Sequence, residues 1–358
     1  MAILGEELDA VVKMAKVKAV LFGAGVIGCR VAKFILEKEG IELVGAIDVA
    51  PDKVGKDLGD ILGIGKRLGV VISNNADAVY RKTKPDITVH TTSSFLKQVY
   101  PQIAKSLQYG VDVVSTCEEL SYPYFGDPAL AKKLDALAKR KKATVLGTGV
   151  NPGFVMDTLP ITLTGVCQKV EHITVMRQMN AATRRIPFQK KIGAGLTVEE
   201  FREKIDKKLI TGHVGLEQSM SMIADALGWK LDKVEVGTVE PVIAKTPVQS
   251  DVIKVEPGRA SGTRQTARGI MGGREVILFD FRAYIGAEEE FDSVTIDGVP
   301  PINEKISPCT HGDFATIAMV VNSIPKVINA PPGLMTMKDL PIPSAAVKNM
   351  AEYIKKKR

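Results

Sequence analysis

Apolar and polar positions along the first half of the chain predict a parallel β-sheet covered by helices. Almost wholly apolar runs predict buried strands at 17–23, 42–48, 86–92, 111–116 and 143–149. Amphipathic stretches between them predict helices at 26–39, 96–109 and 128–141. Strands with no polar face, separated by helices, are typical of a sheet that is buried on both sides. Residues 17–150 are therefore predicted to form a Rossmann-type, doubly wound α/β domain.

The pattern changes after residue 150. Strand-like runs now follow one another at 170–179, 234–244, 263–271, 274–286 and 291–297, with helices inserted at 198–208 and 214–227. This order predicts an α+β substrate and dimerisation domain over 151–310, with a mixed or antiparallel sheet and helices on one face. An apolar helix at 312–324 opens a C-terminal segment, 311–358, that is expected to pack back on the first domain. Residues 1–16 are interpreted as an N-terminal extension, with a short amphipathic helix at 1–13.

Composition and charge exclude several classes of protein. Of the 358 residues, 45% are apolar and 25% are charged, which is ordinary for a globular chain. No run reaches the roughly 20 apolar residues that span a bilayer, and the first residues lack a signal-peptide pattern. We therefore expect a cytoplasmic protein without a membrane partner. The net charge of +7 comes with lysine runs at a predicted helix end and at the C-terminus, which favours acidic substrates or cofactor phosphates over nucleic acid.

The cysteines predict neither a metal site nor a disulfide framework. The four are Cys29, Cys117, Cys167 and Cys309, far apart in the chain. None forms a CxxC pair, and no histidine lies at ligand spacing.

A glycine motif joins the first predicted strand to the first predicted helix. It runs Gly23, Ala24, Gly25, Val26, Ile27, Gly28. In this setting the first glycine permits a tight turn, the second lets a pyrophosphate approach the backbone, and the third lets helix and strand pack closely. Asp48 ends the second strand, where a carboxylate accepts the ribose hydroxyls of NAD and repels a 2′-phosphate. The alternative is that these residues are ordinary loop residues with no role in cofactor binding. NADP is also an alternative cofactor, because Lys53 and Lys56 are close enough in sequence to approach a 2′-phosphate.

Further candidates lie where later strands end, since open α/β sheets bind ligands at that edge. Thr91, Thr92 and Ser93 are predicted to approach the cofactor, with the alternative that Thr92 and Ser93 cap the next helix. Thr116 precedes a Cys117-Glu118-Glu119 turn. One of these two glutamates is expected to face the nicotinamide, the alternative being two solvated side chains.

The hinge and the second domain supply the remaining candidates. Asn151 belongs to a Pro-Gly turn at the domain boundary and is predicted to contact the cofactor. A basic cluster is predicted to hold an acidic substrate, because an arginine fork pairs bidentately with a carboxylate. Its members are Arg177, Asn180, Arg184, Arg185, Gln189 and Lys190. His213 is a further substrate-binding candidate, although it and His311 are as readily interpreted as helix caps or packed residues.

These blocks together resemble a known family. The segments GAGVIG, TTSSFL, VVSTCEELSYP, GTGVNPGF, RQMNAATRRIPFQKKIGAGL, GHVGLEQS and HGDFATIAMVVNSIP resemble the dihydrodipicolinate reductase-like group that contains 2,4-diaminopentanoate dehydrogenases and native amine dehydrogenases. The resemblance covers residues 17–345. The paired-histidine signature and Pro-Ser-Gly-Thr turn of true dihydrodipicolinate reductases are absent, which separates this chain from them. Homoserine dehydrogenases, distantly similar in layout, place a catalytic lysine where this chain places Glu118.

The resemblance implies an NAD(P)-dependent amine dehydrogenase, assembled as a homodimer. It implies that Glu118 or Glu119 binds and deprotonates the substrate amine, since hydride leaves a carbon that bears nitrogen only when the amine is neutral. A small amine or diamino acid is the expected substrate, most readily 2,4-diaminopentanoate. The alternatives are an imine or carbonyl reductase, in which Glu118 only orients the nicotinamide, and a non-catalytic NAD(P) sensor.

Overall fold

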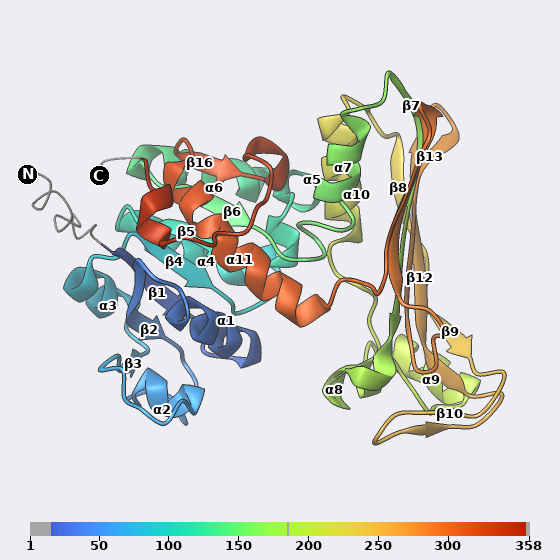
Figure 1. The fold of residues 1–358 in the computed structure, drawn as a ribbon, viewed down its shortest axis with the longest axis horizontal. Coiled ribbons are helices and arrows are strands. Elements are labelled where there is room, and N and C mark those ends of the chain that lie inside the picture. The colour runs from blue at the N-terminus through green and yellow to red at the C-terminus, as the bar shows by residue number, and fades with distance from the viewer. Residues whose placement is uncertain (1–15, 185, 356–358) are drawn as a thin grey trace, which may run out of the picture.

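The computed structural model describes residues 16–184 and 186–355, which form a parallel-sheet unit and a mixed-sheet unit side by side (Figure 1). The helix predicted at 1–13, most of the predicted extension, and Arg185 lie outside the described residues.

The first unit is built on a parallel sheet of seven strands in the order β16-β6-β5-β4-β1-β2-β3, the doubly wound arrangement predicted from the sequence. Its strands are β1 (Val17–Phe22), β2 (Ile41–Ile47), β3 (Ile72–Ser73), β4 (Ile87–His90), β5 (Asp112–Ser115), β6 (Thr144–Gly147) and β16 (Gly333–Met335). Its helices are α1 (Val26–Leu36), α2 (Leu58–Leu62), α3 (Ala76–Thr83), α4 (Leu96–Gln108), α5 (Pro123–Gly126), α6 (Pro128–Lys141) and α11 (Gly312–Asn329), with the 3-10 turns η1 (Glu118–Leu120), η3 (Met337–Asp339) and η4 (Met350–Tyr353).

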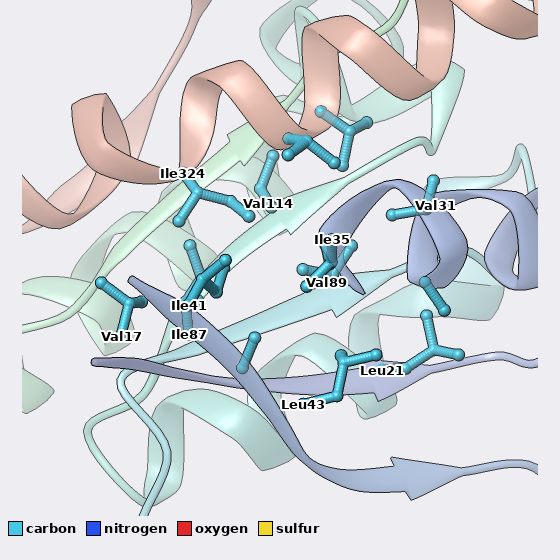
Figure 2. Close-up of a cluster of buried hydrophobic side chains, with 14 of the residues drawn as sticks. Val17, Leu21, Val31, Ile35, Ile41, Leu43, Ile87, Val89, Val114 and Ile324 are labelled. Carbon is cyan, nitrogen blue, oxygen red and sulfur yellow. The ribbon is translucent and has the colours of Figure 1, made fainter. Parts of the chain in front are cut away.

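The core of this unit lies between the sheet and two helices from opposite ends of the chain. Figure 2 shows Val31 and Ile35 of α1 and Ile324 of α11 in one cluster with the strand residues Val89 and Val114. The fully apolar strands predicted from the sequence are explained by this burial, because both sheet faces are covered.

The C-terminal segment adds to the first unit in two ways. Helix α11 packs against α1, and β16 pairs in parallel with β6 at the sheet edge. The helix predicted at 312–324 continues through Pro325 to Asn329. Val327 and Ile328 are buried in the core, and this packing outweighs the backbone hydrogen bond that proline removes.

The second unit is a mixed sheet in the order β15-β14-β7-β13-β12-β8, with β9 also pairing β12. Its strands are β7 (Lys169–Asn180), β8 (Lys233–Val236), β9 (Glu240–Ile243), β12 (Ala260–Met271), β13 (Arg274–Tyr284), β14 (Phe291–Val299) and β15 (Ile302–Ile306), with β10 (Val248–Gln249) and β11 (Lys254–Val255) forming a separate pair. Its helices are α7 (Thr158–Thr164), α8 (Ile186–Lys191), α9 (Val198–Asp206) and α10 (Leu216–Ala226), with the 3-10 turn η2 (Ala181–Thr183).

Strands β7 and β13 run parallel, and their other partners run antiparallel, so the sheet is mixed. Helices α7 and α10 lie between this sheet and the first unit (Figure 1). On the helix side, Met220 and Ile223 of α10 share a buried cluster with Ile277 and Phe279 of β13. Within the described residues, no helix is long and apolar enough to cross a membrane.

Candidate active site

The glycine loop between β1 and α1 has the geometry that dinucleotide binding requires. Gly23 has a φ of 101°, and a Cβ there would lie 2.8 Å from Cγ2 of Thr92. A Cβ on Gly28 would overlap the carbonyl oxygen of Gly23. Both positions therefore need glycine for packing within the protein itself.

Gly25 differs, because a Cβ built on it meets no atom within 4 Å. It is the N-cap of α1 and supplies no side-chain cap, so the first N–H groups of the helix point toward open space. Val26, at the first helical position, is 58% exposed, while Ile27 packs against the core. Free N–H groups under a space kept open by glycine fit a pyrophosphate.

Asp48 lies beside this loop, as the NAD interpretation requires. Its Oδ2 accepts a hydrogen bond from Ala24 N at 2.7 Å, and its Oδ1 accepts one from Ala50 N at 2.9 Å. Burial raises the pKa of Asp48, but the N–H groups of Ala50 and Ala24 and the Lys53 ammonium outweigh it and hold the pKa below its usual value. The carboxylate is therefore charged, and Lys53 Nζ lies 3.6 Å from its Oδ2.

We expect Asp48→Ala to raise the preference for NADP over NAD by about 10-fold, or about 1.4 kcal/mol. The change removes the charge that repels a 2′-phosphate and releases Lys53 to pair with it. The measurement is the ratio of kcat/KM for the two cofactors. Asp48→Asn is the control for the Ala24 contact, since it keeps an oxygen acceptor and removes the charge. A wild-type enzyme that strongly prefers NADP would show that Asp48 has another role.

The turn after β4 supports the glycine loop. Thr91 Oγ1 donates to the Gly23 carbonyl at 2.7 Å, and Thr92 Oγ1 donates to Gln102 Oε1 at 2.6 Å. Ser93 Oγ donates to Gln98 Oε1 at 2.5 Å. The N-cap of α4 is Phe95, so neither Thr92 nor Ser93 is the N-cap of that helix, although Ser93 Oγ accepts the Phe95 N–H at 3.4 Å.

The two glutamates after β5 have different surroundings. Glu119 Oε2 accepts a hydrogen bond from Leu96 N at 2.7 Å, so its carboxylate satisfies the first amide of α4. Burial raises the pKa of Glu118, while its own backbone N–H, the Ser94 side chain and Lys191 act in the other direction. A Cβ built on Gly215 would lie 3.4 Å from the Cβ of Glu118. Glu118 therefore lies against the His213–Gly215 turn of the second unit.

A cavity of about 260 Å³ lies between the two units. Its lining brings together Asn151 from the hinge and Arg177, Arg184 and His213 from the second unit. Thr116, whose N–H donates to the His90 carbonyl at 3.0 Å, does not line it.

Two buried polar atoms at this cavity have no partner among the described residues, namely Asn151 Oδ1 and His213 Nδ1. Asn151 Nδ2 lies 3.4 Å from His213 Nε2, which leaves these two atoms available to a ligand. Burial, with Arg177 and Lys191 nearby, lowers the pKa of His213 to about 4, so the ring is neutral at pH 7.

The two cavity arginines differ in their contacts. Arg177 is 2% exposed, its Nη1 pairs with Asp292 Oδ1 at 2.8 Å, and its Nη2 donates to the Thr310 carbonyl. Arg184 lies near the start of α11, where a Cβ on Gly312 would be 3.7 Å from its Nη2. Across residues 16–184 and 186–355 it forms no ion pair, and only Met179 Sδ lies within reach, at 4.0 Å. Arg184 is therefore the more available of the two for an anion.

Among the described residues of the predicted basic cluster, Asn180, Gln189 and Lys190 do not line the cavity. Asn180 Oδ1 accepts from Ala182 N at 3.0 Å, and Asn180 Nδ2 donates to the Ala287 carbonyl at 3.4 Å. Side chains alternate along a strand, so Asn180 points away from the side of β7 that carries Arg177. Gln189 is buried, and its Nε2 donates to the Arg184 carbonyl at 2.6 Å, which holds the backbone of Arg184 in place.

Several residues at the cavity had no signal in the sequence. Arg30 of α1 pairs with Asp313 of α11 at 2.6 Å, and both line the cavity with Phe188, Phe281 and Phe314. His311 Nδ1 accepts from Phe314 N at 3.4 Å and caps α11, one of the two interpretations given above. No group of three or more His, Cys, Asp or Glu side chains within the described residues could hold a metal ion.

Comparison with known proteins decides the family. Residues 154–356, more than half of the chain, match the 2,4-diaminopentanoate dehydrogenase C-terminal domain, and residues 17–117 match the dihydrodipicolinate reductase N-terminus. The chain is 36% identical to a 2,4-diaminopentanoate dehydrogenase of Acetoanaerobium sticklandii, over 95% of this chain and 98% of that protein. The chain belongs to the 2,4-diaminopentanoate dehydrogenase family. The family predicted from the sequence motifs is confirmed.

Amine dehydrogenases are also similar to this family member. The chain is 22% identical to an amine dehydrogenase of Streptomyces virginiae, over 91% of this chain and 96% of that protein. The solved structure of an amine dehydrogenase from Mycobacterium smegmatis superposes with a TM-score of 0.78 at 29% identity, covering 93% of this chain and 98% of that one. The protein is an NAD(P)-dependent dehydrogenase with a Rossmann-type first unit.

Proposed function

We propose that the protein catalyses NAD(P)-dependent oxidative deamination of an amine, with 2,4-diaminopentanoate the leading substrate and 2-amino-4-oxopentanoate the product. The family relationship supports the reaction. The observation that carries the proposal is the half-buried Glu118, with its raised pKa, which lies against the His213–Gly215 turn. His213 of that turn lines the cavity together with Arg177 and Arg184. A carboxylate for the amine and cations for the substrate's own carboxylate are the groups that a diamino acid needs.

The reaction balances with water as the only further reactant. A primary ammonium, NAD(P)⁺ and water give a ketone, ammonium, NAD(P)H and a proton. When bound, NAD(P)⁺ supplies the hydride acceptor. The Gly23–Gly28 loop and Asp48 would hold its pyrophosphate and adenosine ribose.

Glu118 has two tasks in this scheme. Its carboxylate first takes a proton from the substrate ammonium, because only the neutral amine allows hydride to leave its carbon. After the substrate is oxidised to an iminium, Glu118 takes a proton from the attacking water and returns one to the departing nitrogen. Partial burial raises its pKa and makes it a better base than an exposed glutamate.

The reaction type is tested by incubating the enzyme with NAD⁺ or NADP⁺ and a panel of amines. The panel includes 2,4-diaminopentanoate, single amino acids and simple amines without a carboxylate. We expect NAD(P)H and ammonia to form in equal amounts, fastest with the diamino acid. Turnover of imines or carbonyl compounds with no ammonia from any amine would favour a reductase, and cofactor binding without any turnover would favour a sensor.

We also propose a cytoplasmic homodimer. In Figure 1 helices α7 and α10 cover only one face of the mixed sheet, which leaves the opposite face for a second copy of the chain. Free thiols at all four cysteines suit a reducing compartment. Sedimentation equilibrium should give twice the chain mass of 38.6 kDa, and a single-chain mass would contradict the dimer.

A further inference from the structure

A buried histidine lies beneath the turn that carries Glu118. His90 ends β4 and Ser115 ends β5, and the two residues are paired in the parallel register of these strands. His90 is 1% exposed and Ser115 is fully buried. Both therefore lie at the carboxyl edge of the sheet, below the candidate active site.

Two oxygens lie within hydrogen-bond distance of His90 Nε2, namely Gln102 Oε1 at 2.7 Å and Thr92 Oγ1 at 3.0 Å. The Thr92 hydroxyl donates its own proton to Gln102 Oε1, so both oxygens accept and Nε2 is assigned the proton. In the neutral ring Nδ1 is then a bare acceptor, and it receives the Ser115 hydroxyl at 2.9 Å. Burial lowers the pKa of His90 to about 4, which keeps the ring neutral at pH 7.

Ser115 passes this connection to the glutamate turn. Its Oγ accepts the backbone N–H of Cys117 at 3.1 Å, one residue before Glu118. Because the Ser115 hydroxyl proton points to His90 Nδ1, the lone pairs of Ser115 Oγ stay oriented toward the Cys117 N–H. The path from Gln102 through His90 and Ser115 thus fixes the backbone from which the Glu118 side chain departs.

We propose that His90 is a positioning residue that holds Glu118 in its reactive geometry through Ser115 and the Cys117 amide. This proposal rests on the general-base role of Glu118. Neither His90 nor Ser115 is assigned a contact with substrate or cofactor, so the contribution of the pair is placement. His90 Nε2 also lies 3.0 Å from the hydroxyl of Thr92, a residue predicted to approach the cofactor, so cofactor binding is measured for each variant. A shift of about 1 Å in a reacting group is enough to lower a rate by about 100-fold.

The test compares kcat, at saturating amine and cofactor, for His90→Phe, Ser115→Ala and His90→Asn. We expect the first two to lose about 10-fold or more in kcat. His90→Asn should recover much of the rate, because its Oδ1 can accept the Ser115 hydroxyl as Nδ1 does. The dissociation constant for NADH, measured by fluorescence titration, should change far less than kcat. If His90→Phe does not fold, Ser115→Ala carries the test with a smaller change.

A second buried network gives the matched control. Tyr80 Oη of α3 lies 3.0 Å from Oγ1 of Thr88 and 2.6 Å from Oγ of Ser106 on α4. Thr88 is on the same strand as His90, β4, but away from the Glu118 turn. Tyr80→Phe should lower the melting temperature as the Ser115 change does, with kcat unchanged. Equal losses of kcat in Tyr80→Phe and Ser115→Ala would reduce His90 to a fold-stabilising residue.

The outcomes also separate the two proposals. If Glu118→Gln is inactive while His90→Phe and Ser115→Ala keep the wild-type kcat, the positioning role is wrong and the general base stands. If Glu118→Gln stays active, the general-base role is wrong and the positioning role is overturned with it.

Discussion

Glu118→Gln is expected to lower kcat by about 10²- to 10⁴-fold while cofactor binding survives. Glutamine keeps the size of the side chain and removes its ability to take a proton from the substrate ammonium. The variant's affinity for NADH should be close to that of the wild type, since Gly25 and Asp48 are untouched. Single-turnover rates with excess enzyme over amine measure the chemical step directly. A variant with nearly full activity would end the general-base proposal.

The pH dependence of the wild type belongs to the same prediction. Burial raises the pKa of Glu118, so this carboxylate becomes protonated at a higher pH than an ordinary glutamate does. As the pH is lowered, kcat/KM should therefore begin to fall at that higher pH. A carboxyl with a raised pKa in the folded state costs stability at pH values above that pKa. Glu118→Gln should therefore be at least as stable as the wild type at pH 7, as thermal melts at pH 4 and pH 7 would show.

Glu119→Gln is the matched control for Glu118→Gln. The Glu119 carboxylate accepts from Leu96 N at the start of α4, whereas Glu118 lies against the His213–Gly215 turn. A glutamine oxygen can still accept that bond, so kcat should change little. A loss of kcat in this variant as large as in Glu118→Gln would mean that the whole turn, rather than one carboxylate, determines the rate.

Features set by neighbouring residues could be predicted from the sequence. The strand, glycine loop and helix over Val17–Leu36 form one local signal, and the carboxylate of Asp48 follows it at the end of the next strand. The sequence likewise placed Glu118 and Glu119 at the edge where ligands bind. It could not separate them, because the partner of Glu119 is an amide 23 positions earlier in the chain.

Features that depend on distant pairs could not be predicted. Arg30 and Asp313 are 283 positions apart, and no periodicity links them. The same holds for Arg177, whose partner Asp292 lies 115 positions away on β14. The sequence showed two arginines suited to a carboxylate. Only the fold shows that one of them already has a carboxylate.

This difference between the arginines leads to the second large effect. Arg184→Ala is expected to weaken transition-state binding of 2,4-diaminopentanoate by about 2–5 kcal/mol, which lowers kcat/KM by about 30-fold or more. The Arg184 guanidinium lines the cavity and has no acidic partner among the described residues. A substrate carboxylate would be the first anion to pair with it. A simple amine without a carboxylate never uses this contact and should be turned over almost as well by the variant.

Arg177→Ala is the contrasting variant, because it leaves Asp292 buried and unpaired and should lower the free energy of unfolding by about 3–5 kcal/mol. Its defect should therefore appear in denaturant melts and fall on both classes of substrate alike. Arg184→Ala should melt like the wild type and discriminate between them. Arg184→Lys keeps the charge without the planar fork and should recover only part of the loss. Equal losses for the diamino acid and the simple amine in Arg184→Ala would show that Arg184 supports the fold or the cofactor site and does not bind the substrate carboxylate.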